Sequence, residues 1–123
     1  MANHLEDLKK QLSLFAKARE WEKFHIPRNL VMAICGEAGE LAAEFQWLRD
    51  EEATALSDSN NPKRQAVVDE MADVFIYLVR LADILEVDLI EASRSKIRRN
   101  EARFPPGANG PEPSTTLDFD YPS

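Results

Sequence analysis

The chain has 123 residues, enough for one domain with a modest core, and its 22 acidic and 15 basic side chains give a formal net charge of −7. This acidic balance argues against a nucleic-acid polymer as partner, because a phosphate backbone requires a basic surface, but it leaves a single nucleotide open. The first residues lack the apolar segment of a secretory signal, and no apolar run is long enough to span a bilayer. We therefore expect a cytoplasmic protein without membrane contact.

The sequence patterns predict an all-α protein with almost no strand. Apolar residues recur every three or four positions along most of the chain, and prolines or turn formers separate the repeats. Pro27 and Asn29 mark one helix entry, Pro62 marks another, and Asp88 is placed to cap a third. Residues 50–62 are polar and are expected to form a loop. The predicted helices span residues 5–24, 29–49, 62–86 and 89–103.

Two stretches depart from this pattern. The segment "VFIYLVRLADIL" is apolar on nearly every side of its helix, more than a small bundle can bury, so we expect a homo-oligomer, either a dimer or a tetramer. After Phe104 the chain carries five of its seven prolines and has no helical period. The sequence therefore predicts a folded domain over residues 1–104 and a flexible, proline-rich tail over residues 105–123.

Two pairs of acidic residues share one spacing. Glu37 and Glu40 in "GEAGELAAE" lie one turn apart on a helix face, and Glu70 and Asp73 in "VVDEMADVF" repeat that arrangement. Either pair alone is typical of a solvated face. If the two helices pack together, however, four carboxylates converge and repel unless a cation joins them. Oxygen ligands without His or Cys favour Mg²⁺, with Mn²⁺ as the alternative.

The same predicted helix contains two glycines and the only cysteine of the chain. A glycine inside a helix costs about 1 kcal/mol relative to alanine, so Gly36 and Gly39 are expected to permit close approach of another helix or of the metal site. Cys35 lies in an apolar run and is expected to be a small core residue.

The last predicted helix carries a row of polar side chains. Lys96, Asn100 and Arg103 fall at positions i, i+4 and i+7, which is one face. Two cations and an amide in line suit the outer phosphates of a nucleotide, but a solvated basic face has the same spacing. The spacing alone does not decide between these readings.

Aromatic residues at helix ends are the other candidates. Trp21 and Trp47 stand beside charged residues, where an indole either belongs to the core or stacks on a base. Tyr77 lies one turn beyond Asp73, so its hydroxyl reaches toward a sugar or phosphate. His25 is expected to have a structural role in the connection between helices.

The segments "GEAGELAAEFQW" and "DEMADVFIYLVRLAD" together resemble the MazG-like all-α nucleoside triphosphate pyrophosphohydrolases. The family signature E-x-x-E, a spacer and E-x-x-D corresponds to the two acidic pairs. "AREWEKFHIPRNL" and "SKIRRNEARFP" are similar to the dCTP pyrophosphatase branch. Close relatives in that branch carry a histidine where this chain has Leu12, so that contact is lost or replaced.

The resemblance implies a MazG-like four-helix bundle assembled as a homo-oligomer, commonly a tetramer. It implies Mg²⁺-dependent hydrolysis of dCTP or a related deoxynucleoside triphosphate to the monophosphate and pyrophosphate. Two alternatives stay open: a helical interaction module with a structural cation, and a pyrophosphohydrolase for a different nucleotide. The implied metal ligands and catalytic residues are Glu37, Glu40, Glu70 and Asp73, and the implied nucleotide contacts are Trp21, Trp47, Tyr77, Lys96, Asn100 and Arg103.

Overall fold

The computed structural model describes residues 4–107 of the chain. Within this range it contains five α-helices and one 3-10 turn and no strand, which confirms the predicted all-α class. The tail predicted to begin at residue 105 lies largely outside the described residues. The elements are α1 (His4–Ala18), α2 (Pro27–Phe45), α3 (Asp50–Thr54), η1 (Ala55–Ser57), α4 (Arg64–Ile84) and α5 (Leu89–Arg103).

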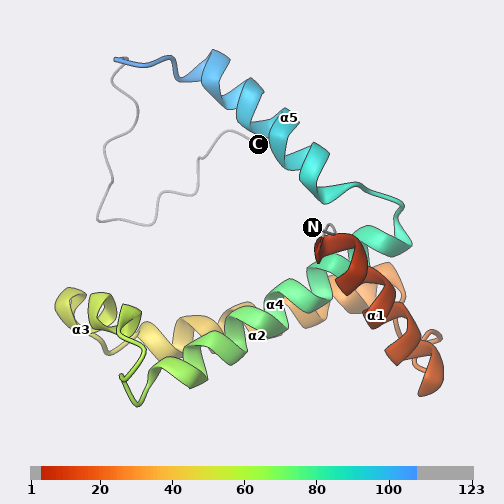
Figure 1. Cartoon of the computed structure of the whole chain (residues 1–123), viewed down its shortest axis with the longest axis horizontal. Coiled ribbons are helices and arrows are strands. Elements are labelled where there is room, and N and C mark those ends of the chain that lie inside the picture. The colour runs from red at the N-terminus through yellow and green to blue at the C-terminus, as the bar shows by residue number, and fades with distance from the viewer. Residues whose placement is uncertain (1–3, 108–123) are drawn as a thin grey trace. The chain divides into compact units, whose positions relative to one another are not determined.

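The described residues form two units, one ending at Val87 and the other beginning at Asp88. In the first unit α2 and α4 run antiparallel, side by side, and α1 packs on α4 near one end of the pair (Figure 1). Helix α3, which follows α2 and precedes α4 along the chain, lies at the other end of the pair (Figure 1). The buried apolar side chains among the described residues are few, namely Ala16, Leu30, Leu56, Val67, Val79 and Ala82.

Helix α1 ends at Ala18, six residues before its predicted end. The amide of Trp21 donates to the carbonyl of Ala16 (2.9 Å), and that of Glu20 donates to Lys17 (3.1 Å). This is the Schellman arrangement, in which a left-handed residue closes the helix. Here that residue is Glu20, with φ of 56°, instead of the usual glycine. The prediction was wrong at this end because no glycine or asparagine marked the turn.

Helix α4 ends in the same way. Glu86 has φ of 56°, and the amide of Val87 donates to the carbonyl of Ala82 (2.8 Å). In both turns the alanine that accepts a hydrogen bond from the amide five residues later is buried, so each closure is anchored in the core. The two turns direct the residues that follow them, Trp21 and Val87, back over the end of the preceding helix.

The loop predicted over residues 50–62 is partly helical. Helix α3 begins after Arg49, and the Glu52 carboxylate accepts hydrogen bonds from the Arg49 amide (3.1 Å) and from Arg49 Nε (3.0 Å). The acidic first turn of α3 also suits the positive end of the helix dipole. The prediction missed this helix because its five residues are too short to show an apolar period.

The outer face of α2 corrects two predictions. An alanine Cβ at Gly36 or Gly39 would meet no atom of the described residues within 4 Å, so neither glycine permits a close approach within the chain. Cys35 on the same helix is exposed and does not belong to the core. Among the described residues both predictions are therefore wrong, while close approach of another subunit to the glycines stays a prediction.

Helix α5 belongs to the second unit and has the bounds that the sequence predicts. Asp88 caps it, as expected: its Oδ1 accepts a hydrogen bond from the Glu91 amide (3.0 Å). Arg98 pairs with Glu91 across two turns (3.1 Å). None of the helices in the described part of the chain is both long enough and apolar enough to cross a membrane.

Candidate active site

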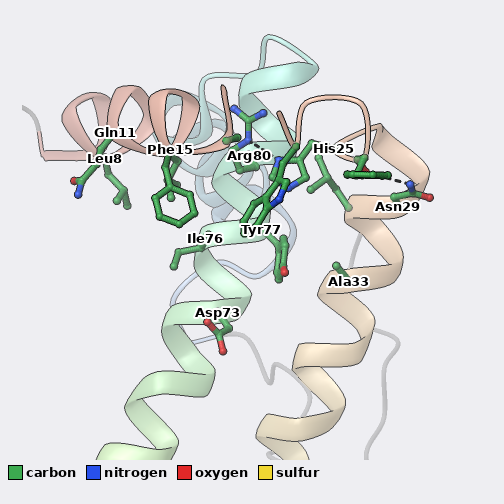
Figure 2. Close-up of a pocket in the computed structure, with 15 residues that line it drawn as sticks. Leu8, Gln11, Phe15, His25, Asn29, Ala33, Asp73, Ile76, Tyr77 and Arg80 are labelled. Carbon is green, nitrogen blue, oxygen red and sulfur yellow. Dashed lines mark hydrogen bonds between the residues drawn. The ribbon is translucent and has the colours of Figure 1, made fainter. Parts of the chain in front are cut away.

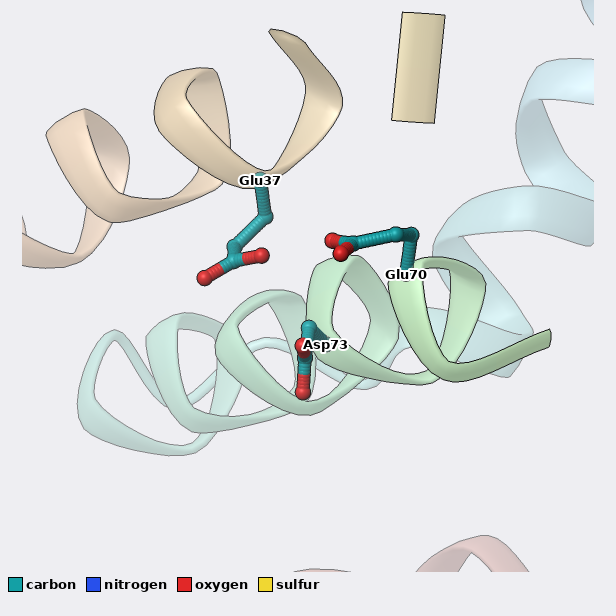
Figure 3. Close-up of side chains that lie close together, drawn as sticks. All are labelled: Glu37, Glu70 and Asp73. Atoms are coloured by element: carbon teal, nitrogen blue, oxygen red, sulfur yellow. The ribbon is translucent and has the colours of Figure 1, made fainter. Parts of the chain in front are cut away.

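Three carboxylates meet between the middle of α2 and the first half of α4. One oxygen each from Glu37, Glu70 and Asp73 lies within 4.8 Å of the other two. Figure 3 shows Glu37 reaching from α2 across to α4, where Glu70 and Asp73 face it from successive turns. The antiparallel pairing of the two helices brings these residues together, as the repeated spacing predicts.

The electrostatics of this acidic cluster, defined as Glu37, Glu70 and Asp73, are unfavourable by themselves. The pKa of Glu70 is raised to about 7, first by burial and then by its interaction with Glu37 and the charge of Glu40. Burial also raises the pKa of Glu37, which the hydrogen bond with Glu70 opposes and the charges of Glu40 and Asp73 reinforce. In the absence of a cation, Glu70 is therefore only partly ionised near neutral pH.

The donor set fits a hard divalent cation. Oε2 of Glu37 and Oε2 of Glu70 are buried and have no hydrogen-bond partner among the described residues. Buried polar atoms are nearly always paired, so two such carboxylate oxygens in one cluster indicate a ligand from outside residues 4–107. Three carboxylates and no nitrogen or sulfur match the ligands of Mg²⁺ or Mn²⁺.

Glu40 stands beside the cluster and outside it. Its side chain is exposed, and none of its oxygens joins the three that lie within 4.8 Å of one another. Its charge nevertheless raises the pKa of Glu37 and of Glu70, so it lies within electrostatic range of both. Its role as a fourth metal ligand remains a prediction.

A cavity of about 710 Å³ opens next to the cluster, within the size range of small-molecule sites. Asp73, Ile76, Tyr77 and Arg80 line it from one face of α4, at i, i+3, i+4 and i+7, so it extends for about 10 Å along that helix. Figure 2 shows Asp73 at one end, Arg80 at the other and Tyr77 between them. The cavity thus leads directly away from the acidic cluster.

Helix α1 and the turn after it also line this cavity. Trp21 lines the cavity, and its ring meets Phe15 edge to face with centroids 5.6 Å apart. The Schellman turn at Glu20 places Trp21 there, because it folds the chain back over the end of α1. Trp21 is 42% exposed, which leaves one ring face available for stacking.

The inner end of the cavity contains two residues that sequence reasoning did not assign to the site. Arg80 is only 6% exposed, and its Nε donates to Nδ1 of His25 (3.3 Å; Figure 2). Burial lowers the pKa of His25, and the charge of Arg80 lowers it further. A lone arginine inside "VFIYLVRLADIL" was the available signal, because a charge in an apolar helix requires a partner.

The remaining predicted residues lie in other parts of the chain, one just after α2 and three in the second unit. Trp47 follows the end of α2, is 85% exposed and does not line the cavity. Lys96, Asn100 and Arg103 lie on α5, in the second unit, where the Arg103 guanidinium packs 5.7 Å from the Phe104 ring centre. The contacts proposed for these four residues therefore remain predictions.

Comparison with known proteins gives consistent results. The dCTP pyrophosphatase 1 of Bos taurus and that of Homo sapiens are each 46% identical to this chain over 101 residues, and that of Mus musculus is 47% identical over 102. These alignments cover 82% of this chain and 59% of each relative, so the chain spans about three-fifths of the length of the curated relatives it matches.

A solved structure is similar as well. The crystal structure of a pyrophosphatase from Archaeoglobus fulgidus matches with a TM-score of 0.75 and 39% sequence identity, covering 85% of this chain and 95% of that one. The model of the MazG-like family matches residues 32–109, which include the acidic cluster and make up more than half of the chain. On these grounds the chain belongs to the MazG-like family.

Proposed function

We propose that this chain is a nucleoside triphosphate pyrophosphohydrolase that converts dCTP, or a closely related deoxynucleotide, to the monophosphate and pyrophosphate. The acidic cluster carries the proposal, because it holds three partly buried carboxylates, two of them with an unpaired oxygen, and its Asp73 lines a cavity large enough for a nucleoside. The names of the curated relatives support both the reaction and the base, and the name of the solved neighbour supports the reaction.

In this proposal Glu37, Glu70 and Asp73 hold a Mg²⁺ ion, with Glu40 as an additional ligand. A bound divalent ion supplies charge neutralisation for the triphosphate and a nucleophilic water near neutral pH. The carboxylates fix the position of the phosphates at the mouth of the cavity. Attack at the α-phosphorus, in line with the departing pyrophosphate, gives the proposed products.

The cavity orients the rest of the nucleotide. Trp21 and Tyr77 both line the cavity, where an aromatic face stacks on a base and a hydroxyl meets the sugar. Asp73 lies at the end nearest the cluster, so the phosphates point toward it and the base points toward Arg80. In the proposed complex Lys96, Asn100 and Arg103 bind the outer phosphates, and Trp47 adds a second aromatic contact.

The test is a pyrophosphate-release assay on a panel of deoxynucleoside triphosphates, with Mg²⁺ and with EDTA. We expect Mg²⁺-dependent release of pyrophosphate, fastest for dCTP. Activity that persists in EDTA would contradict the assigned role of the acidic cluster. Release of orthophosphate would place the attack at another phosphorus. A protein that melts at a higher temperature with Mg²⁺ but hydrolyses no nucleotide would instead be an interaction module.

We also propose that the protein acts as a homo-oligomer. Val68, Met71, Phe75 and Leu78 recur every three or four residues along α4 and are each more than one third exposed, a stripe typical of a helix–helix interface. Light scattering after size-exclusion chromatography should give a dimer or tetramer for the native chain, and Met71→Glu should shift it toward the monomer. A native monomer would contradict this proposal.

A further inference from the structure

The Arg80–His25 pair has no role in the hydrolysis proposed above, yet it joins two residues 55 positions apart in the sequence. Besides the bond to His25, Arg80 forms an ion pair in which its Nη1 lies 3.5 Å from Oδ2 of Asp83. Burying a guanidinium carries a large desolvation cost unless its N–H groups keep hydrogen-bond partners. Arg80 therefore constrains the protonation state of the groups that accept its hydrogen bonds.

Arginine can only donate. The guanidinium has five N–H groups and no acceptor, and it does not lose its proton in proteins. In its bond to Arg80, Nδ1 of His25 must therefore be the unprotonated acceptor. A neutral imidazole with a bare Nδ1 carries its proton on Nε2, so the second nitrogen of His25 is a fixed donor.

The imidazole also resists gaining a second proton. Burial and the neighbouring positive charge both lower the pKa of His25, so the ring stays neutral at physiological pH. Protonation would in addition break the bond from Arg80 and set two cations side by side. His25 is thus restricted to a single state: neutral, with a donor at Nε2.

This fixed donor lies where the base of a nucleotide would reach. His25 and Arg80 line the cavity at the end opposite Asp73, two turns along α4 from the acidic cluster. The ring of Trp21, the proposed stacking residue, has its centroid 6.3 Å from that of His25. A nucleotide with its phosphates at the acidic cluster would therefore present the edge of its base to His25.

We propose that Arg80 locks His25 as a hydrogen-bond donor to the base, and that this lock selects cytosine over uracil and thymine. The inference rests on the proposed function. N3 of cytosine accepts a hydrogen bond, whereas N3 of uracil and thymine carries a proton. A histidine free to change tautomer can donate to N3 of cytosine or accept from N3–H of uracil or thymine. His25, with its proton held on Nε2, would instead place its N–H against the N3–H of uracil or thymine. Two donors then face each other, and leaving a buried donor unpaired is costly. Arg80 is then a positioning residue, and His25 is the specificity contact.

Three substitutions test this lock. Arg80→Met keeps much of the side-chain volume and removes the donor to Nδ1. Arg80→Lys retains a cationic donor that cannot accept. His25→Asn replaces the locked ring by an amide that can rotate, and it serves independently if Arg80→Met does not fold. The ratio of kcat/KM for dCTP to that for dUTP should fall by at least about tenfold in Arg80→Met and His25→Asn, and should stay near the native value in Arg80→Lys.

Equal losses for both substrates, with an unchanged ratio, would overturn the inference and leave the proposed function standing. If no nucleotide is hydrolysed, the proposed function fails, and the same ratio is measured from the equilibrium binding of dCMP and dUMP. Loss of discrimination in Arg80→Met then still supports the lock, whereas a native protein that binds both equally, or neither, overturns it.

A spectroscopic measurement is independent of any substrate. The chain has two histidines, so His4→Gln leaves His25 as the only source of imidazole signals. Nitrogen-15 shifts should show an unprotonated Nδ1 and a protonated Nε2 in this background, and a mixture of tautomers after Arg80→Met. A tautomer mixture already present with Arg80 in place would overturn the lock.

Discussion

Helix α4 carries two groups of partly or fully buried charges about two turns apart, and they differ in whether the chain supplies their partners. Arg80 has His25 and Asp83 beside it. Glu70 and Asp73 face a third acid, Glu37, and two of the carboxylate oxygens are buried without a hydrogen-bond partner among the described residues. A buried charge that is paired internally positions its neighbours, whereas one left unpaired indicates a ligand from outside.

The largest effect should come from the unpaired group. Asp73→Asn removes one negative ligand from the acidic cluster, and we expect a loss of activity of at least about 100-fold. Because the substitution also relieves repulsion, the variant should be no less stable than the native protein in EDTA. Pyrophosphate release and thermal melting measure the two effects. Glu44→Gln, an exposed glutamate on α2, is the matched control, and an unfolded Asp73→Asn variant would show that the acid is structural.

The paired group should respond in stability. Asp83→Ala leaves Arg80 buried with a neutral histidine as its only partner, and we expect a loss of about 1–3 kcal/mol in the free energy of unfolding. Arg80→Met should cost less, because Asp83 is 29% exposed and is solvated once the arginine is gone. Urea denaturation gives both values. The reverse order would mean that Asp83 contributes little to holding the buried guanidinium.

The two groups should also differ in their response to pH. In EDTA, Glu70 keeps a proton up to about pH 7 in the folded state, but it loses that proton near its ordinary value of 4.5 once unfolded. The folded state therefore binds more protons between these values, and the melting temperature should fall as pH rises through this window. Mg²⁺ should abolish or reverse this slope, because it favours the ionised carboxylates. A fall of equal size with saturating Mg²⁺ would contradict a cation site there.

The smallest effect should come from the face of α2 turned away from both groups. Gly39→Ala adds a Cβ that meets no described atom of the chain and restricts the unfolded state, so it should stabilise the protein by about 0.5–1 kcal/mol. The measurement is the midpoint of urea denaturation. Destabilisation, or loss of oligomer on light scattering, would reveal that another subunit packs against this glycine.

Several features of the fold and the site could be predicted from local pattern alone. The apolar period located the helices, and the cap at Asp88 fixed the start of α5. The i, i+3 spacing of the acids was enough to expect Glu37, Glu70 and Asp73 on facing helices. The ends of α1 and α4 were harder to predict from the sequence. In both turns a glutamate, instead of the usual glycine, adopts the left-handed conformation that closes the helix.

The sequence by itself determined the features that depend on neighbours within a few residues. These are the helical class, the cap at Asp88 and the spacing of the acids along their helices. Only the tertiary structure decided which charges meet, because that depends on how α2, α4 and the turn after α1 pack together. In the folded chain Glu40 lies outside the tight set of carboxylates, and a Cβ at either glycine of α2 would contact no described atom within 4 Å. Arg80 is hydrogen-bonded to a histidine 55 residues earlier in the sequence. The residues next to an arginine in the sequence do not show whether its side chain is buried, because burial depends on how the helices pack.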